Sequence, residues 1–281
     1  MPVSTISVVI PALNERDNVE HVIRSIPVRE LATQGWTTEI LVVDNGSTDG
    51  TGELARRAGA RVLVQPVRGY GNAYKAGFAN AVGDVIATGD ADRTYPFEIL
   101  PGLLRVMQKE QLDFLTTNRL LFAEQGAMKP SHRFGNAVLT QSSRMILKLP
   151  FSDSQSGMWM FHRHILRSLD LRSPGMAFSQ EIKHEAVARG FRCGEVAIKY
   201  RSRGGDVKLN AARDGLRNLG QLAMHRLRRD RQVAPPAVID LRHYESSKHP
   251  ALVIHQGGAP GVADRMGEGA EDPALPIIAS Q

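Results

Sequence analysis

The sequence lacks the features of a disulfide-stabilised, secreted or membrane-spanning protein. Cys193 is its only cysteine, so no disulfide can form within the chain, which predicts the reducing cytoplasm as its compartment. The first residues carry no basic flank, long apolar core or small-residue cleavage site, so we expect no signal peptide. No run approaches the roughly 18 apolar residues of a membrane span. We therefore expect a cytoplasmic protein that is soluble or bound peripherally at the cytoplasmic face of a membrane.

Internal repeats, long heptads and nucleic-acid-binding motifs are also missing, and we expect no nucleic acid partner. What is present is a chain of 281 residues, 42% hydrophobic and 23% charged, which suits one large or two small domains with a sizeable core. The whole formal net charge of +6 lies between Arg201 and Arg231, where nine Lys/Arg accompany three Asp/Glu. A basic block of this kind indicates an anionic partner: a phosphate, a membrane surface or nucleic acid, of which the missing motifs disfavour the last.

Short apolar runs alternate with amphipathic segments through the first 118 residues. The apolar runs end in polar loops, as buried parallel strands do, and the segments between them place aliphatic residues on one helical face. Strands are expected at 6–13, 39–44, 61–65, 84–89 and 112–118, and helices at 15–26, 51–59, 71–81 and 97–109. This order predicts an α/β fold with a mostly parallel twisted sheet, helices on both faces, and ligands at the carboxyl ends of the strands.

The chain divides into three parts. Residues 1–118 form the regular, Rossmann-like half, and residues 119–230 follow a less regular pattern that we expect to complete the sheet. In this second half, helices are expected at 132–149 and 178–190, and strands at 156–161 and 195–200. Residues 231–281 contain six of the fifteen prolines and no sustained periodicity, which predicts a mostly disordered tail.

A basic amphipathic helix is predicted at 209–229. Leu and Ala recur there at alternating three- and four-residue steps, while most arginines lie elsewhere on the helix. Such a helix binds a membrane surface or, alternatively, packs onto the rest of the domain.

Polar residues follow three of the predicted strands. Asn14 and Glu15 follow the first strand, Asp44 follows the second, and Asp90 and Asp92 follow the fourth. Because the carboxyl ends of parallel strands meet at one edge of a sheet, we expect these residues to share a cleft.

The spacing of Asp90 and Asp92 predicts paired carboxylates. Side chains two residues apart on an extended chain project to the same face. Hard oxygen ligands of this kind suit Mg²⁺ or Mn²⁺, which complete their shells with water and substrate phosphates, so a nucleoside diphosphate is a natural partner. The alternative is a solvated acidic turn, because Gly, Asp and Arg are ordinary loop residues.

Two further loops depart from known binding motifs. Residues 68–77, RGYGNAYKAG, match neither a dinucleotide fingerprint nor a phosphate loop; their glycines allow close approach of an anionic ligand or form a tight turn only. Residues 44–50, DNGSTDG, lack the ligand spacing of a calcium loop. In this second loop Asp44 is a candidate acceptor for hydrogen bonds from a base or ribose, and Ser47 or Thr48 for capping the next helix.

Five motifs, VVIPALNE, VVDNGSTDGT, RGYGNAYKAG, GDADRTYP and SDSQSGMWMF, resemble in order and spacing those of the family 2 glycosyltransferases, which have the GT-A fold. The sequence is most similar to the branch of dolichyl- or polyprenyl-phosphate mannosyl- and glucosyltransferases. The resemblance covers about residues 4–225. It implies an inverting, metal-dependent transferase that moves a hexose from a donor of the GDP-mannose or UDP-glucose type to a polyprenyl phosphate.

The resemblance also implies roles for single residues on the donor side. The positions that match the base, ribose and donor-loop residues are Pro11, Leu13, Asn14, Glu15, Asp44, Gly69 and Lys75. Asp90, Ala91 and Asp92 match the D-x-D motif, whose carboxylates hold a Mg²⁺ or Mn²⁺ ion that bridges the donor diphosphate. Thr94 stands where many lipid-phosphate relatives carry a glutamine that adds a metal ligand.

On the acceptor side, Arg119 and Arg133 match arginines that engage the acceptor phosphate, and residues 201–208 resemble the basic acceptor loop. Asp153 matches a position that often serves as the base in enzymes with hydroxyl acceptors. With Asp92, these three residues are the implied catalytic set.

Three functions are compatible with these residues. The first is transfer to a polyprenyl phosphate, the second is transfer to a soluble hydroxyl acceptor such as a saccharide or natural product, and the third is nucleotide-sugar binding without turnover. The intact Asp90/Asp92 pair and Asp153 argue against the third.

Overall fold

The structure, a computed structural model, describes residues 4–124, 127, 130–147, 149, 151–204, 220 and 239–240 of the chain. The helix predicted at 209–229 lies outside the described residues except for Gly220. The predicted tail lies outside them except for the two residues of a short strand.

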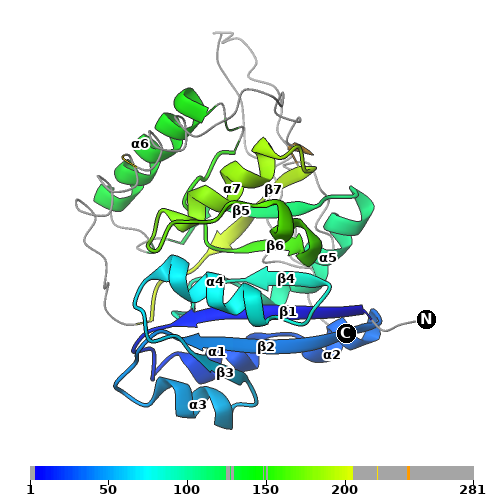
Figure 1. The fold of residues 1–281 in the computed structure, drawn as a ribbon, viewed down its shortest axis with the longest axis vertical. Helices are drawn as coiled ribbons and strands as arrows, with labels where there is room; N and C mark the ends of the chain where they lie inside the picture. Colours follow the sequence, from blue (N-terminus) through cyan, green and yellow to red (C-terminus); the bar gives the residue numbers. More distant parts are fainter. Residues whose placement is uncertain are drawn as a thin grey trace, which may run out of the picture.

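One sheet of eight strands runs through the described chain (Figure 1). The strands are β1 (Ser4–Ala12), β2 (Trp36–Asp44), β3 (Arg61–Val64), β4 (Val85–Thr88), β5 (Phe114–Ala123), β6 (Trp159–His162), β7 (Cys193–Tyr200) and β8 (Ile239–Asp240). Their order across the sheet is β3-β2-β1-β4-β6-β5-β7-β8, and only the two pairs that involve β6 are antiparallel. The predicted mostly parallel sheet is therefore confirmed.

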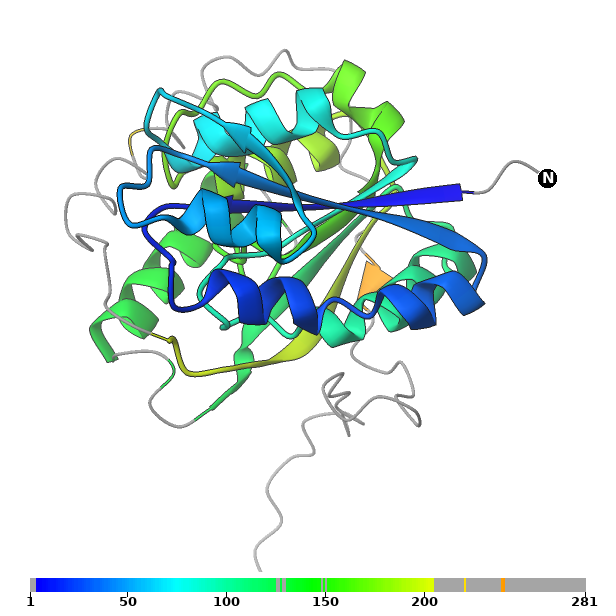
Figure 2. The same ribbon diagram turned by 90° about the horizontal axis from the view of Figure 1, so that it is seen from below.

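Helices cover both faces of this sheet. They are α1 (Val19–Ser25), α2 (Val28–Thr33), α3 (Thr51–Arg57), α4 (Tyr70–Asn80), α5 (Leu100–Lys109), α6 (Pro130–Leu147) and α7 (Phe178–Ala188), with short 3₁₀ helices η1 (Phe97–Ile99) and η2 (Arg163–Ser168). Alternation along β1 separates two cores: Val8 packs with α1 and α5, whereas Val9 packs with α4 and α7. Figure 2 shows α1 and α4 on opposite sides of the strands.

The first helix is shorter than the pattern predicted, and a second helix follows it. Residues 15–18 form a turn, closed by hydrogen bonds from the Asn18 and Val19 N–H groups to the Glu15 carbonyl, so α1 begins at Val19. Pro27 has no N–H to continue the helix and favours an extended residue before it; Ile26 has ψ 122°. The chain then forms α2, which the sequence pattern did not predict.

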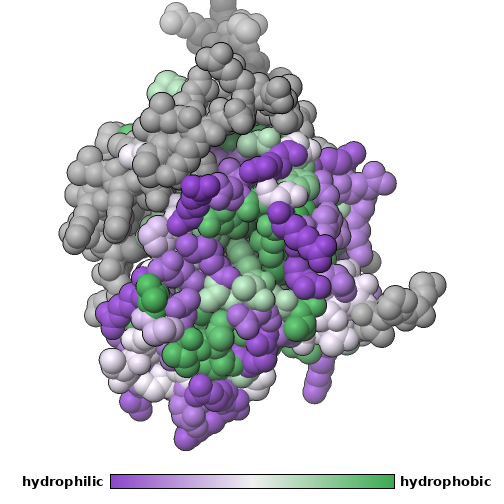
Figure 3. Space-filling model, in the orientation of Figure 1, coloured by the Kyte–Doolittle hydropathy of each residue, from purple (hydrophilic) through white to green (hydrophobic). Residues whose placement is uncertain are grey.

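Within the described residues, no helix combines the length and the apolar character that crossing a membrane requires. On the face drawn in Figure 3, apolar side chains of the described residues are interspersed with hydrophilic ones. Several large apolar side chains are exposed, such as Val67 before α4 and Met145 on α6, which is common on protein surfaces.

Candidate functional site

The loops that carry the predicted site residues meet at one edge of the sheet. β1, β2, β4, β5 and β7 end at this edge, and β6, which runs the opposite way between β4 and β5, begins there. Residues 152–157 are thereby brought to the same edge as the loops that follow β1, β2 and β4, and the Gly157 N–H donates to the Tyr95 hydroxyl (2.6 Å). Main-chain hydrogen bonds join these loops, from Asn45 to Ala12 (2.9 Å) and from Gly204 to Asp92 (3.0 Å).

Asn14 and Asp44 shape the loop after β2. Asn14 has a left-handed backbone (φ 53°); its N–H donates to the Ser47 hydroxyl (3.0 Å) and its side-chain oxygen accepts the Thr48 N–H (2.9 Å). The Ser47 N–H donates to Asp44 Oδ1 (2.8 Å). The N-terminal cap of α3 is Gly50, without a side-chain cap, so the prediction that Ser47 or Thr48 caps this helix is wrong.

The second carboxylate oxygen of Asp44, Oδ2, lies next to Gly52 in the first turn of α3. A Cβ on Gly52 would lie 2.6 Å from Asp44 Oδ2, closer than a Cβ atom can approach an oxygen without displacing it. The glycine therefore makes room for this half-buried carboxylate. An oxygen that is not committed to the loop suits the predicted acceptance of a hydrogen bond from a ribose or base.

Glu15 and Asp92 share one arginine. Glu15 is 8% exposed, and its Oε2 accepts a hydrogen bond from the Asn18 side chain (2.7 Å). Arg203 places Nη2 at 3.2 Å from Glu15 Oε1 and Nη1 at 3.3 Å from Asp92 Oδ2. The loop that the sequence assigned to the acceptor thus also reaches the carboxylates assigned to the donor.

Asp90 and Asp92 lie directly after β4. The Tyr70 hydroxyl donates to Asp90 Oδ1 (3.0 Å), and Thr94 donates to Asp92 Oδ1 through its hydroxyl (2.6 Å) and its N–H (3.1 Å). Burial and the adjacent charge of Asp92 raise the pKa of Asp90 to about 7. A raised pKa means that negative charge at this place is under-compensated, so a bound cation would be stabilised here.

The acidic pair fits a divalent cation of the Mg²⁺ or Mn²⁺ kind. Among the residues that the structure describes, no group of three or more His, Cys, Asp or Glu is arranged to hold a metal, as a closed zinc site would be. Mg²⁺ needs only one or two carboxylates, since water and substrate phosphates complete its shell. Thr94 orients Asp92 by hydrogen bonds from its hydroxyl and its N–H.

The two glycines at the start of α4, Gly69 and Gly71, are in close contact with the protein's own main chain. A Cβ on Gly69 would lie 2.3 Å from the Pro174 carbonyl oxygen, and one on Gly71 would lie 2.1 Å from that of Ser173. Lys75, one turn into α4, donates to the Arg172 carbonyl (3.2 Å). The close approach that the sequence left open is therefore made by residues 172–174, and donor contacts of Gly69 and Lys75 stay predictions.

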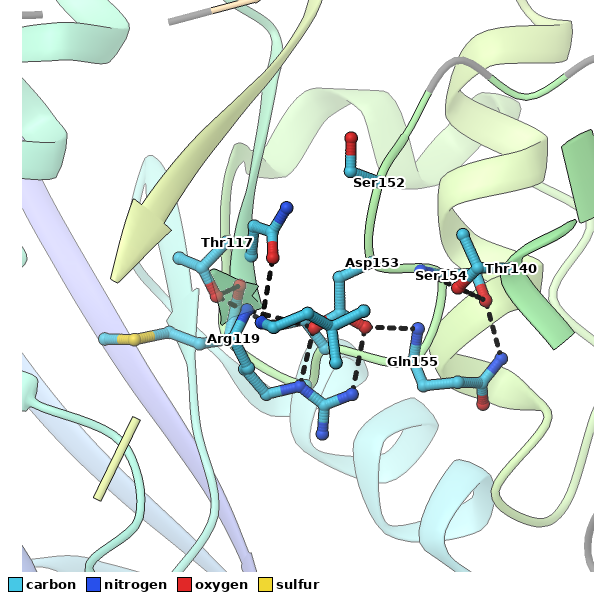
Figure 4. A network of polar contacts seen from close by, with 12 residues as sticks. Thr117, Arg119, Thr140, Ser152, Asp153, Ser154 and Gln155 are labelled. Carbon is cyan, nitrogen blue, oxygen red and sulfur yellow. Dashed lines mark hydrogen bonds and ion pairs between the residues drawn. The ribbon is translucent and has the colours of Figure 1, made fainter. Parts of the chain in front are cut away.

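Arg119 and Asp153 form a buried, two-pronged ion pair (Figure 4). Arg119 Nε lies 2.7 Å from Asp153 Oδ2, Nη2 lies 2.9 Å from Oδ1, and the Arg119 N–H also donates to Oδ2 (3.0 Å). The Gln155 N–H supplies a fourth hydrogen bond, to Oδ1 (3.0 Å). Burial alone would raise the pKa of Asp153, but the charge and hydrogen bonds of Arg119, together with the charge of Lys183, lower it to about 2.

Two charged residues next to this pair carried no signal in the sequence motifs. Lys183 on α7 donates from Nζ to the Asp153 carbonyl (2.8 Å), and Glu195 on β7 accepts the Ser152 and Asp153 N–H groups. Both act on main-chain atoms, which every residue type possesses, so no motif of side chains marks them. The one available signal was a lysine within the predicted helix at 178–190, next to apolar positions.

The positions of the remaining predicted residues indicate no specific role. Pro11 and Leu13 are half-buried at the end of β1, and Ala91 is 2% exposed, in the core. Arg133 lies in α6, and its side chain is outside the described residues.

Comparison with known proteins agrees with this arrangement. The sequence model of glycosyl transferase family 2 matches residues 7–170. The low-salt glycan biosynthesis hexosyltransferase Agl6 of Haloferax volcanii is 36% identical over 219 residues, 76% of this chain and 52% of that protein. The dolichyl-phosphate hexose transferase of the same organism is 31% identical over 205 residues, 73% of this chain and 86% of that protein. The chain thus spans about half the length of Agl6.

Solved structures share the fold. Glucosyl-3-phosphoglycerate synthase from Mycobacterium tuberculosis, crystallised with Mn²⁺, UDP and glucosyl-3-phosphoglycerate, superposes with a TM-score of 0.62 at 26% identity. The superposition covers 79% of this chain and 80% of that one. The polar edge of a mostly parallel sheet, the acidic pair after β4 and the match over more than half of the sequence lead to one conclusion: the chain belongs to glycosyltransferase family 2 and has the GT-A fold.

Proposed function

We propose that the protein transfers a hexose from a nucleoside diphosphate sugar to a polyprenyl phosphate, with inversion at the anomeric carbon. The observation that carries this proposal is the Arg119–Asp153 pair: a positive group held rigidly at the edge of the sheet, beside a carboxylate that cannot act as a base. The name of the Haloferax volcanii dolichyl-phosphate hexose transferase supports the same acceptor class.

A phosphate acceptor needs a cation and no base. At neutral pH the phosphate is already an anion, whereas a hydroxyl acceptor must lose a proton as it attacks. Asp153 accepts four hydrogen bonds and has a pKa of about 2, so it holds a proton too weakly to act as a general base. We infer that Asp153 orients Arg119 instead.

Arg119 has donors left for a ligand. Asp153 occupies its Nε and Nη2, and no residue within the described chain accepts a hydrogen bond from Nη1. The charge of Arg119 also lowers the pKa of Asp90, so it acts electrostatically on the acidic pair. A planar guanidinium fixed on one side presents its other side to a phosphate without further loss of side-chain freedom.

The reaction is then a single displacement. An acceptor phosphate oxygen forms a bond to the anomeric carbon while the bond from that carbon to the donor diphosphate breaks, and the electron pair leaves with the diphosphate. A divalent cation held by Asp90 and Asp92 would neutralise charge on that leaving group. Asp44 and Asn14 hold the nucleoside, Thr94 orients Asp92, and Arg119 orients the attacking phosphate.

The test is a transfer assay with two donors and two acceptors. Radiolabelled UDP-glucose or GDP-mannose is incubated with Mn²⁺ and either farnesyl phosphate or 3-phosphoglycerate, and label is counted in the organic and aqueous products. We expect organic-soluble label from one donor, abolished by EDTA. Absence of lipid-linked product from both donors would contradict the proposal.

Transfer to a soluble acceptor is the second candidate, and one observation favours it. The M. tuberculosis synthase with a similar fold was crystallised with a glucosylated phosphoglycerate. Label in 3-phosphoglycerate alone would establish this function. A protein that binds the donors but shows neither transfer nor metal-dependent donor hydrolysis would be a binding module.

A further inference from the structure

The main chain of Asp153 is held by charged side chains on both sides. Glu195 accepts the Ser152 N–H with both carboxylate oxygens (3.0 and 2.9 Å) and the Asp153 N–H with Oε1 (3.0 Å). Lys183 Nζ donates to the Asp153 carbonyl (2.8 Å). The Asp153 N–H therefore donates to a negative group on β7, and the Asp153 carbonyl accepts from a positive group on α7.

Removing these charges from water has a cost, since Lys183 is buried and Glu195 is half-buried. Lys183 is fully buried, and this burial lowers its pKa to about 7. Burial raises the pKa of Glu195. Charged groups in such places are often less favourable than apolar residues of the same volume, and Lys183 lies on a helix whose neighbouring residue Ile182 is part of the apolar core. Packing alone gives no reason for a lysine here.

The effect of the pair extends to Arg119. The Asp153 side chain makes three of its four hydrogen bonds to Arg119, so the guanidinium takes its position from the Asp153 carboxylate. A shift of the Asp153 main chain would shift both prongs of this ion pair. Displacements of about 1 Å at a reacting group are known to cost rate without loss of fold.

We propose that Lys183 and Glu195 are positioning residues, which fix Asp153 by its main chain and so hold the Arg119 guanidinium where an acceptor phosphate binds. This inference rests on the proposed function, in which Arg119 contacts the acceptor phosphate. Neither residue touches the ligand; both act through Asp153.

A purely structural role is the alternative, and it makes different predictions. Loss of a structural contact lowers the free energy of unfolding but leaves binding unchanged well below the melting temperature. Loss of positioning weakens acceptor binding and spares the donor site. Positioning that acts through Arg119 must also disappear when Arg119 no longer forms its two-pronged contact.

The experiment measures equilibrium binding of farnesyl phosphate in EDTA and of UDP with Mn²⁺, by the ligand-induced rise in melting temperature, for Lys183→Met, Arg119→Lys and their double variant. Lys183→Gln, which keeps a shorter N–H donor, and Glu195→Gln serve as second variants if Lys183→Met does not fold. Ile182→Val, a packing change on the same helix, is the matched control for lost stability.

We expect Lys183→Met to weaken farnesyl phosphate binding about tenfold and to change UDP binding less than twofold, with partial recovery in Lys183→Gln. In the Arg119→Lys background the same change should have no further effect. In turnover, KM for farnesyl phosphate should rise more than kcat falls.

The other outcomes overturn the inference, alone or together with the proposed function. If Arg119→Lys binds farnesyl phosphate as the unaltered protein does, both the proposed function and this inference fail. If Arg119→Lys weakens binding but Lys183→Met does not, or if their effects multiply, only the inference fails. The inference alone also fails if Ile182→Val weakens farnesyl phosphate binding as much as Lys183→Met does.

Discussion

Asp90 and Asp153 lie at the same edge of the sheet, the first half-buried and the second fully buried, yet their pKa values are shifted in opposite directions. Burial and the neighbouring Asp92 raise the pKa of Asp90 to about 7. At Asp153 the effect of burial is overridden by Arg119 and by hydrogen bonds, and the pKa falls to about 2. Asp153 has the Arg119 charge as its direct partner, whereas the pKa of Asp90 stays raised although Arg203 contacts Asp92. A bound metal ion would therefore be stabilised at the first site, while the charge at the second site is already neutralised.

The largest effect is expected from breaking the Arg119–Asp153 ion pair. Arg119→Ala leaves the Asp153 carboxylate buried without its cation, which should lower the free energy of unfolding by about 3 to 5 kcal/mol. Denaturant unfolding followed by circular dichroism measures this loss. The double variant Arg119→Met with Asp153→Leu removes both charges of the ion pair and should recover most of the lost stability. Equal losses in both variants would contradict the electrostatic account.

Substitutions in the acidic pair of Asp90 and Asp92 should lower activity and leave stability unchanged. Asp92→Asn removes one of the two carboxylates proposed to hold the metal, and a lost electrostatic group of this kind costs about 2.7 to 4 kcal/mol of transition-state stabilisation, roughly a hundred- to a thousandfold in kcat. The initial rate of transfer with Mn²⁺ gives the result, together with the melting temperature.

Asp84 is the matched control for this variant. It precedes β4, whereas Asp90 and Asp92 follow it, and its Oδ2 accepts the Thr5 N–H at the opposite end of the strand. Asp84→Asn should keep near-normal turnover. A rate for Asp92→Asn within tenfold of the unaltered protein would remove the metal assignment.

The difference between the two sites also explains what the sequence could and could not predict. Asn14, Asp44 and Asp90 could be placed together because apolar runs mark strands, and polar residues after parallel strands meet at one edge. The direction of β6 could not be read from its short apolar run, because periodicity does not distinguish parallel from antiparallel pairing. That direction is what brings residues 152–157 to the site.

The partners of Asp153 were still harder to predict. Lys183 and Glu195 lie 30 and 42 residues further along the chain, and both contact main-chain atoms. The resemblance matched Asp153 to a base, whereas the structure surrounds it with donors, and only the folded arrangement of β5, α7 and β7 reveals this. Likewise, the glycines at the start of α4 indicated a close approach without showing that Ser173 and Pro174 make it.

Acid should reduce the stability contributed by the Arg119–Asp153 ion pair over a defined range of pH. The pKa of Asp153 falls from its ordinary value of 3.8 when unfolded to about 2 when folded, so the unfolded chain binds more protons between these values. Stability from this group is fully present above pH 3.8 and is lost as the pH falls towards 2, by about 2 kcal/mol in all.

Denaturant unfolding between pH 2 and pH 5 in EDTA tests this sign and size. Asp153→Asn has no titrating group at this position, so its free energy of unfolding should fall less steeply over the same range. Parallel slopes for the two proteins would show that the ion pair does not set the acid stability.

The smallest effect is expected on the donor side, at Asp44, where one carboxylate oxygen is assigned to the nucleoside. A Cβ on Gly52 would lie 2.6 Å from Asp44 Oδ2, while Oδ1 is tied to the Ser47 N–H, so Gly52→Ala must displace the oxygen that we assign to the nucleoside. Loss of one such hydrogen bond, about 1 to 1.5 kcal/mol, should weaken UDP binding roughly tenfold and leave farnesyl phosphate binding unchanged. Gly175→Ala is the control, because a Cβ there meets nothing within 4 Å. Binding of UDP measured by titration calorimetry for both variants decides the matter: equal affinities would mean that Asp44 does not contact the nucleoside, and the uncommitted oxygen above α3 would then have no ligand to explain it.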